Sequence, residues 1–206
     1  MPSAIVHLKV AYDIAQKLGV KNYGQFYAGA VSPDAVNIDG FADQSVRYPA
    51  HLRSLDYEEW KATARNFCKE KGAEWAGRED YLKGFLLHIF TDIYWDELAQ
   101  PEMFEGFERL GYSPDELRDV KWKELYRFNA LLLGGWLFDD VLPKMKKTEL
   151  YPIGTVGLDQ LTRYIDDLTG NYLTRSVINE PTLVCHMGMV EKVEQACFEE
   201  MDKLFK

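Results

Sequence analysis

The sequence predicts an all-α protein that folds as one domain over residues 1–206. Apolar residues recur every three or four positions through most of the chain, as they do on one face of an α-helix. No stretch longer than a few residues alternates apolar and polar side chains in the way a half-buried strand does. No linker rich in Gly, Pro or Ser and no internal repeat divides the chain, whose 206 residues suit one domain.

The segment from Tyr81 to Pro101 is predicted to be the central helix of this bundle. It is apolar on nearly every side, which is typical of a helix in the middle of a fold, and Pro101 is expected to end it. It nevertheless contains His88 and Asp92, four residues apart and therefore on one face, and Asp96 continues that line. Because burying an unpaired charge is costly, this pair needs a partner or a bound metal ion.

Two polar residues of interest precede the central helix near the N-terminus. Ser3 is the expected N-cap of a first helix that stops before Gly19, and His7 lies one turn before its apolar face. A short apolar segment then leads into Ser32-Pro33-Asp34, a pattern typical of a turn or of the start of a helix. An acidic residue such as Asp34 is favoured in a first turn by the helix dipole.

The periodicity of apolar residues also predicts the segments before and after the central helix. Residues 37–57 have an irregular pattern and are predicted to form a long loop that contains His51. Residues 58–76 read as an amphipathic helix. After Pro101, the pattern predicts a short helix opening at 113–116 and longer helices over 121–141, 158–172 and 190–204, with Gly134-Gly135 allowing close helix contact or a bend.

Composition and charge exclude several classes of protein. A net charge of −9 without a stripe of Lys or Arg argues against general binding to duplex nucleic acid. No segment approaches about 18 uninterrupted apolar residues, so no transmembrane segment is expected. Three widely spaced cysteines without a CxxC pair and an N-terminus without a leader pattern predict a cytoplasmic protein. The oligomeric state is not defined by any pattern.

Five side chains supply imidazole and carboxylate donors in one part of the chain, and such donors suit zinc and similar divalent ions. Three of the four histidines belong to this set, and the fourth, His186, is expected to have a core or capping role. The set is His7, Asp34, His51, His88 and Asp92.

The order of these residues resembles the zinc-dependent phospholipase C family, which is related to the fungal single-strand nucleases. An early histidine in a first helix is followed by FYAGAVSPDA, by the histidine of RYPAHLR and by GFLLHIFTDIYW with its HxxxD spacing. The resemblance covers about the first hundred residues in motif order, and beyond them it extends only to helical content. It implies an all-helical fold of this type that holds a cluster of zinc ions.

Carried over by position, the resemblance implies that Asp34, His51, His88 and Asp92 hold one metal ion. His7 and Asp92 hold a second, with Asp92 bridging the two. Two zinc ions about 3.5–4 Å apart would activate a shared water and neutralise the oxygens of a phosphoryl centre. Asp34 and Asp92 are therefore predicted catalytic residues.

The third zinc site of the family has no counterpart in this sequence. The family has a further histidine shortly after HxxxD and a later His/Glu pair, whereas here that region reads DELAQ. The only later histidine, His186, lies five and eight residues before Glu191 and Glu194, which does not give an i,i+4 pair. One or two zinc ions, or other divalent metals, are expected rather than three. Asp96, the third predicted catalytic residue, either substitutes as a ligand or protonates the leaving group.

The predicted function is therefore metal-dependent, in the first place zinc-dependent, hydrolysis of a phosphate ester by a metal-bound hydroxide. The enzyme would be a phosphodiesterase or of phospholipase C type, and its substrate a small phosphate ester or a phospholipid-like molecule. Tyr27, Tyr94, Trp95 and Trp136 either line its pocket or belong to the core. Two alternatives stay open: a nucleotide phosphohydrolase of the HD type, which the sequence disfavours by lacking an adjacent His-Asp pair, and a non-catalytic metal-binding protein.

Overall fold

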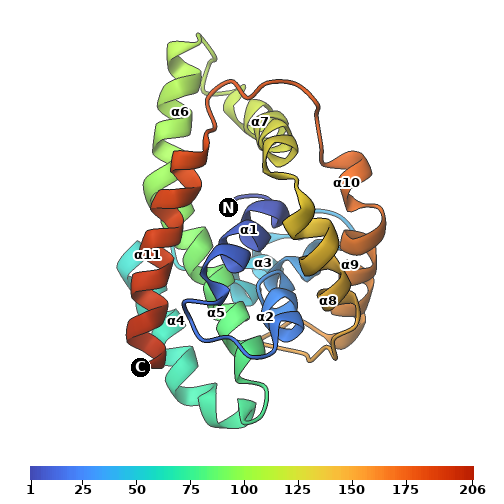
Figure 1. Ribbon diagram of the computed structural model, residues 1–206. Helices are drawn as coiled ribbons and strands as arrows, with labels where there is room; N and C mark the ends of the chain where they lie inside the picture. Colours follow the sequence, from blue (N-terminus) through green and yellow to red (C-terminus); the bar gives the residue numbers. More distant parts are fainter.

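Every regular element of the protein is a helix, as the sequence predicts. The computed structural model describes residues 1–206 (Figure 1). The elements in chain order are α1 (Ala4–Ala15), α2 (Tyr23–Gly29), the 3₁₀-helix η1 (Ser32–Asn37), α3 (Gln44–Ala50), α4 (Tyr57–Lys71), the 3₁₀-helix η2 (Gly72–Trp75), α5 (Glu79–Tyr94), the π-helical turn η3 (Trp95–Ala99), α6 (Gln100–Arg109), α7 (Leu117–Leu132), the π-helical turn η4 (Trp136–Val141), α8 (Leu142–Lys146), α9 (Leu158–Gly170), α10 (Tyr172–Arg175) and α11 (Met187–Phe205).

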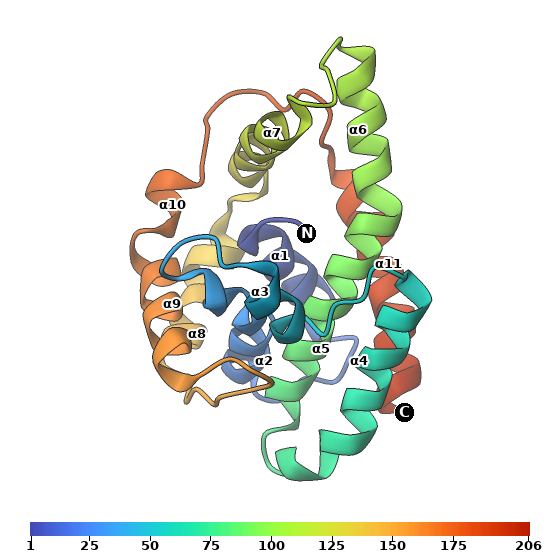
Figure 2. The same cartoon turned by 180° about the vertical axis from the view of Figure 1, so that it is seen from behind.

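The central helix of the bundle is α5. Only three of its sixteen residues, Glu79, Lys83 and Tyr94, are not buried. The helices α1, α2, α4 and α11 all pack against it, and the two views of the ribbon show them around it (Figures 1 and 2). A helix covered on every side needs apolar residues on every side, which explains the sequence of this segment.

Pro101 does not end the central helix, contrary to the prediction. The chain continues through η3 into α6 and stays helical as far as Arg109. In an α-helix, proline lacks the N–H that would bond the carbonyl four residues back, and its ring clashes with that carbonyl. Just before Pro101, the amide of Gln100 instead bonds the carbonyl of Trp95, five residues back. This wider register lets the helix pass the proline.

Other boundaries also differ from the expected ones. The predicted loop 37–57 contains the short helix α3, and His51 is the residue that caps its C-terminal end. No separate helix opens at 113–116, where the Ser113 amide and hydroxyl both donate to the Glu116 carboxylate in a turn before α7. The expected helix over 121–141 is interrupted after Leu132, at Gly134 and Gly135. Helices this short depend on contacts that periodicity over a few residues does not reveal.

The helices α2 and α5 cross at two glycines. A Cβ atom added to Gly84 would lie 2.0 Å from the carbonyl oxygen of Phe26, and one added to Gly29 would lie 2.2 Å from that of Tyr81. Real Cβ atoms do not approach backbone oxygens this closely, so only glycine permits the crossing. The crossing places the carbonyl of Ala30, next to Gly29, against the middle of α5.

A buried carboxylate holds the long connection between α10 and α11 across α7. Glu124 is fully buried, and one of its oxygens accepts hydrogen bonds from the backbone amides of Leu183, Val184 and Cys185, each at 2.8 Å. Three amide donors compensate the burial of the charge. The connection therefore passes over α7 in a defined position (Figure 1).

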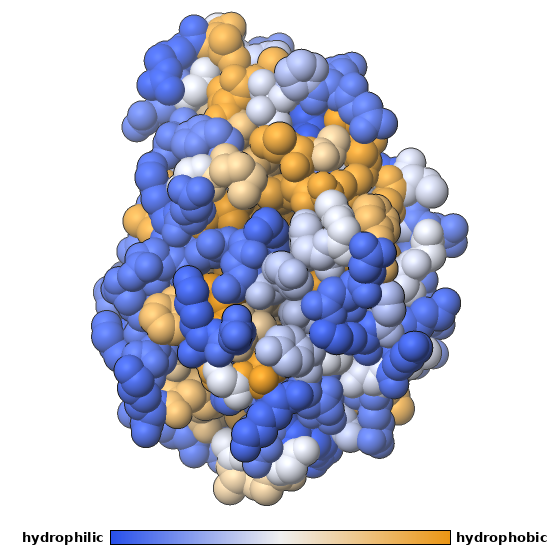
Figure 3. Space-filling model, viewed as in Figure 1, coloured by the Kyte–Doolittle hydropathy of each residue, from blue (hydrophilic) through white to orange (hydrophobic).

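The outer surface is mostly hydrophilic, with an apolar area in the upper part of the view of Figure 3, in the region of α7 and α11. Leu131 of α7 and Leu183 of the connection before α11 are exposed apolar residues. None of the helices combines the length and the apolar character that crossing a membrane requires. None of the three cysteines forms a disulfide bond.

We expect the Gly84→Ala substitution to lower the free energy of unfolding by about 1–3 kcal/mol or more, because the added methyl group overpacks the α2–α5 crossing. Equilibrium denaturation by urea measures the change. Gly170→Ala is the matched control, since nothing lies within 4 Å of a Cβ added at the end of α9, and it should leave stability unchanged or raise it. Equal stability of Gly84→Ala and the unsubstituted protein would contradict the close crossing.

Candidate metal centre

The structure brings the five predicted donor residues together at the centre of the protein. His7 comes from α1, Asp34 from η1, His51 from the end of α3, and His88 and Asp92 from α5. Donor atoms of two overlapping groups lie within 4.8 Å of one another: His7 with His88 and Asp92, and Asp34 with His51 and His88. Four of the five residues are at most 1% exposed, and the side chain of Asp34 is 14% exposed.

Asp92 is the hub of this cluster. Its Oδ1 lies 3.4 Å from Nε2 of His7, whereas its Oδ2 lies 3.7 Å from Nε2 of His88 and 3.8 Å from Nε2 of His51. On the far side of the cluster, Nε2 of His51 lies 3.4 Å from Oδ1 of Asp34. The two oxygens of one carboxylate thus face different imidazoles, the arrangement required of a carboxylate that bridges two cations.

Backbone carbonyls orient two of the imidazoles. Nδ1 of His88 lies 2.8 Å from the carbonyl oxygen of Ala30, and Nδ1 of His51 lies 2.9 Å from that of Arg47. A carbonyl only accepts hydrogen bonds, so both Nδ1 atoms carry a proton and both Nε2 atoms face the cluster. Metal-binding histidines are held in this way by an acceptor on the opposite ring nitrogen. The indole of Trp60 further restrains His51 by donating to its carbonyl oxygen at 2.9 Å.

The centre of the cluster contains buried polar atoms without hydrogen-bond partners. They are both ring nitrogens of His7, Nε2 of His88 and both carboxylate oxygens of Asp92. Buried polar groups are almost always hydrogen-bonded, because an unsatisfied one costs about 1–3 kcal/mol. Several unpaired lone pairs that converge on one point fit a bound cation. Imidazole nitrogen and carboxylate oxygen are donors that zinc accepts.

The protonation states of the central pair also fit a cation. Burial, together with the neighbouring His7, lowers the pKa of His88 to about 3, so its imidazole is neutral. The rings of His7 and His88 are stacked with their centroids 3.7 Å apart. Burial alone would raise the pKa of Asp92, but its imidazole neighbours outweigh burial and lower it. A neutral imidazole and an ionised carboxylate are the forms that bind metal ions.

The outer pair, His51 and Asp34, is held by mutual attraction. Burial would lower the pKa of His51, but the hydrogen bond with Asp34 and the charge of Asp92 raise it above its ordinary value. Burial would raise the pKa of Asp34, yet the same hydrogen bond and the nearby imidazoles lower it. A cation in the cluster would therefore have to displace a proton shared by this pair.

Asp96 and His186, the remaining polar residues of the sequence prediction, lie outside the two donor groups. Asp96 accepts hydrogen bonds from Nη2 of Arg53 at 3.0 Å and from the amine of Met1. His186 is exposed, at the N-terminal boundary of α11, and its Nε2 lies 2.9 Å from a carboxylate oxygen of Glu102. It has no role in the cluster, and contrary to the expectation it is neither a core residue nor a side-chain cap, since it occupies the N-cap position of α11 without a capping hydrogen bond.

A cavity of about 510 Å³ adjoins the cluster, and both Asp34 and Asp96 line it. Its walls come from the N-terminal segment, the region of η1 and α3, the start of α6, α7, α9 and α10, which surround the N-terminus in Figure 2. Both charged and aromatic side chains line the wall. The aromatic ones are Phe41, Phe104, Trp122, Tyr126, Tyr164 and Tyr172.

Sequence reasoning did not identify these wall residues. Tyr27 and Trp95, two of the aromatic residues considered for a pocket, are instead buried in the core, and Tyr94 and Trp136 do not line the cavity either. Arg53 was identifiable in principle, since it follows His51 by two positions in the motif RYPAHLR. No local pattern distinguishes the cavity residues of α7 from other polar residues on an amphipathic helix.

Comparison of the chain with protein-family models, with curated protein sequences and with solved structures gives no match. The functional proposal below therefore rests on the geometry of the cluster and of the cavity.

We expect the protein, purified without chelator and reconstituted with zinc, to retain one or two zinc ions per chain. His88→Ala and Asp92→Ala should lose them, because each removes a donor from the centre of the cluster. His186→Ala is the matched control and should retain them, since its imidazole is exposed and distant from the donor groups. Mass spectrometry of the metal content, with circular dichroism to verify folding, makes the comparison. Equal zinc content in all four proteins would refute the assignment.

Proposed function

We propose that this protein is a metal-dependent, in the first place zinc-dependent, hydrolase of phosphate esters. One observation carries the proposal: a buried cluster of imidazole and carboxylate donors with unpaired lone pairs lies beside a cavity lined with cationic side chains. Imidazoles and carboxylates suit a divalent cation, and Arg and Lys bind the oxygens of phosphates. A site that combines both suits a substrate with a phosphoryl group.

Asp34, His51, His88 and Asp92 would hold one cation, and His7 with Asp92 would hold a second. When bound, the metal supplies polarisation of phosphoryl oxygens and a lower pKa for a water molecule at neutral pH. The protein contributes orientation. The carbonyls of Ala30 and Arg47 keep Nε2 of His88 and of His51 directed at the cluster, so neither ring has to turn on binding, and only the proton shared by His51 and Asp34 has to leave.

Among the cationic side chains of the cavity, Arg53 is the one that its neighbours hold most firmly in position to bind a phosphoryl group. Its guanidinium lies over the ring of Trp60, 4.7 Å from the centroid, and it donates to Asp96 at 3.0 Å. Its Nε atom is buried without a hydrogen-bond partner. A planar guanidinium held in this way can bind a phosphoryl oxygen with little loss of side-chain entropy. We assign to Arg53 the role of binding the non-bridging oxygens of the substrate.

Asp96 acts in this proposal as a positioning residue for Arg53. Its two oxygens already accept from Arg53 and from the amine of Met1. A carboxylate placed between two cations supports an orienting role better than proton donation. The roles of general acid and of substitute metal ligand, which the sequence allowed, stay predictions.

The position of the cluster favours catalysis over a purely structural metal site. A structural site is closed, with every coordination position filled by the protein, whereas a catalytic site keeps one position open to water or substrate. Asp34 both belongs to the donor groups and lines the cavity, so one side of the cluster faces the space where a substrate fits.

We expect the zinc-loaded protein to hydrolyse bis-p-nitrophenyl phosphate or p-nitrophenyl phosphate. Asp92→Asn should reduce kcat/KM by at least about 100-fold, the upper range for losing a residue that merely orients a metal ligand. Release of p-nitrophenol measures the rate, and the two substrates separate diesterase from monoesterase activity.

The control for this assay is Asp115→Asn, at an exposed position in the turn before α7, which should keep full activity. A zinc-loaded protein that hydrolyses neither substrate would favour the non-catalytic metal-binding alternative. Full activity of Asp92→Asn would refute the proposed site.

A further inference from the structure

The cavity beside the donor cluster contains more positive charge than its own carboxylates neutralise. Five cationic side chains line it. Two of them are paired with acids of the same wall, Arg53 with Asp96 at 3.0 Å and Arg175 with Asp167 at 2.8 Å. The other three, which have no carboxylate partner, are Arg47, Arg118 and Lys121.

The contacts of these three side chains are with neutral groups or with none. Nε of Arg47 donates to the carbonyl oxygen of Ala42 at 2.7 Å, and its guanidinium lies over the ring of Phe41. Nζ of Lys121 donates to the side-chain amide oxygen of Gln100. Arg118 makes no hydrogen bond or ion pair. The carboxylates of this wall do not pair with these three side chains, since Asp96 and Asp167 bind Arg53 and Arg175, and Asp34 lies beside His51.

Arg118 and Lys121 form one unit of this wall. They are three residues apart on α7 and therefore lie on one face of that helix. Both residues line the cavity. Lys121 is partly buried in this wall, and burial lowers the pKa of its ammonium group. A desolvated cation with no acidic hydrogen-bond partner gains more from an incoming anion than an exposed one does.

The balance of charges in the cavity indicates that a negative charge of the substrate is missing. The charge of a scissile phosphoryl group would be neutralised at the donor cluster, while Arg53, whose charge is balanced by Asp96, would contact its oxygens. A simple diester carries one negative charge, and binding it there leaves Arg47, Arg118 and Lys121 without a counter-charge. A cationic headgroup would add to this excess and is disfavoured by it.

We propose that the cavity takes a phosphate ester that carries a second anionic group, and that Arg118 and Lys121 bind this second group. The inference rests on the proposed function, because the scissile phosphoryl group is placed at the donor cluster. It narrows the substrate class to molecules with two separate anionic groups, such as bisphosphorylated or carboxylated phosphate esters. The aromatic wall then encloses the part of the substrate between them.

Glucose 1-phosphate and glucose 1,6-bisphosphate are suitable probes, since they differ only by the second phosphate. Isothermal titration calorimetry on the zinc-loaded full chain should show that the bisphosphate binds at least about tenfold more tightly. Hydrogen bonds to charged groups contribute an affinity gain of this size. The advantage should shrink as salt is added. In the Arg118→Gln/Lys121→Gln double variant it should vanish, while the affinity for glucose 1-phosphate changes little.

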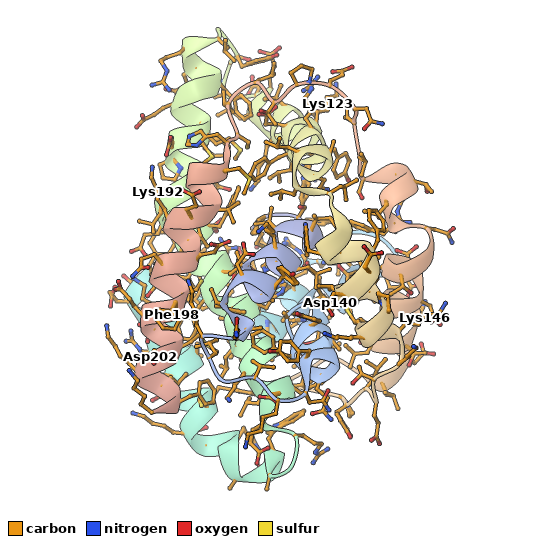
Figure 4. The ribbon with its side chains drawn as sticks, viewed as in Figure 1. Lys123, Asp140, Lys146, Lys192, Phe198 and Asp202 are labelled. Atoms are coloured by element: carbon orange, nitrogen blue, oxygen red, sulfur yellow. The ribbon has the colours of Figure 1, made fainter.

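Lys123→Gln is the matched control, because Lys123 is an exposed lysine of the same helix that does not line the cavity (Figure 4). It should keep the full preference for the bisphosphate. Circular dichroism and zinc content verify that each variant is folded and loaded.

Equal affinity of the unsubstituted protein for the two sugars would overturn the inference, as would an unchanged preference in the double variant. Phosphate release from the same two sugars is measured in parallel with hydrolysis of bis-p-nitrophenyl phosphate. Hydrolysis without any preference for the bisphosphate refutes the second anionic subsite alone. Preference in binding without hydrolysis of any ester supports the subsite and contradicts the proposed reaction.

Discussion

The close crossing of α2 and α5 is the constraint on which the donor cluster depends. Gly29 and Gly84 let two backbones approach until only hydrogen atoms fit between them. The chain leaves α2 at this point, and the carbonyl of Ala30 then reaches Nδ1 of His88 at 2.8 Å. That hydrogen bond decides which imidazole nitrogen faces Asp92. A looser crossing would leave His88 free to rotate and its lone pair undirected.

The polar cluster lowers the stability of the apolar fold that surrounds it. The apolar core that makes α5 a central helix removes water from His88 and Asp92, and the lone pairs left without partners lower stability. Residues that cost stability in the middle of a core are characteristic of functional sites. The same burial keeps His88 neutral and strengthens every electrostatic interaction at the site.

A second set of contacts connects the cluster to the cavity. The indole of Trp60 donates to the carbonyl of His51, and the ring of the same residue lies under the guanidinium of Arg53. Arg53 in turn reaches Asp96, the residue one helical turn beyond Asp92. One buried tryptophan of α4 thus positions both a donor of the cluster and a cation of the cavity wall. The proposed metal donors and the proposed substrate contact are therefore connected through a single packed side chain.

The helical class, the central helix and the five candidate donor residues could all be predicted from the sequence. Helical periodicity and the four-residue spacing of His88 and Asp92 are local properties, so they can be predicted without knowing the fold. Motif order then added His7, Asp34 and His51. The grouping of these residues within a few ångströms is a property of the folded chain.

The remaining features depend on how distant segments of the chain pack together. The passage of the helix through Pro101 requires a π-helical turn, and the ion pair of Asp96 with Arg53 joins residues 43 positions apart. In the sequence, the cationic face of α7 has the same pattern as any other amphipathic helix. Its place in a cavity depends on the N-terminal segment and α10, which form other parts of the wall. Each of these features depends on contacts between distant segments, and their energies are set by packing and burial, which local spacing does not encode.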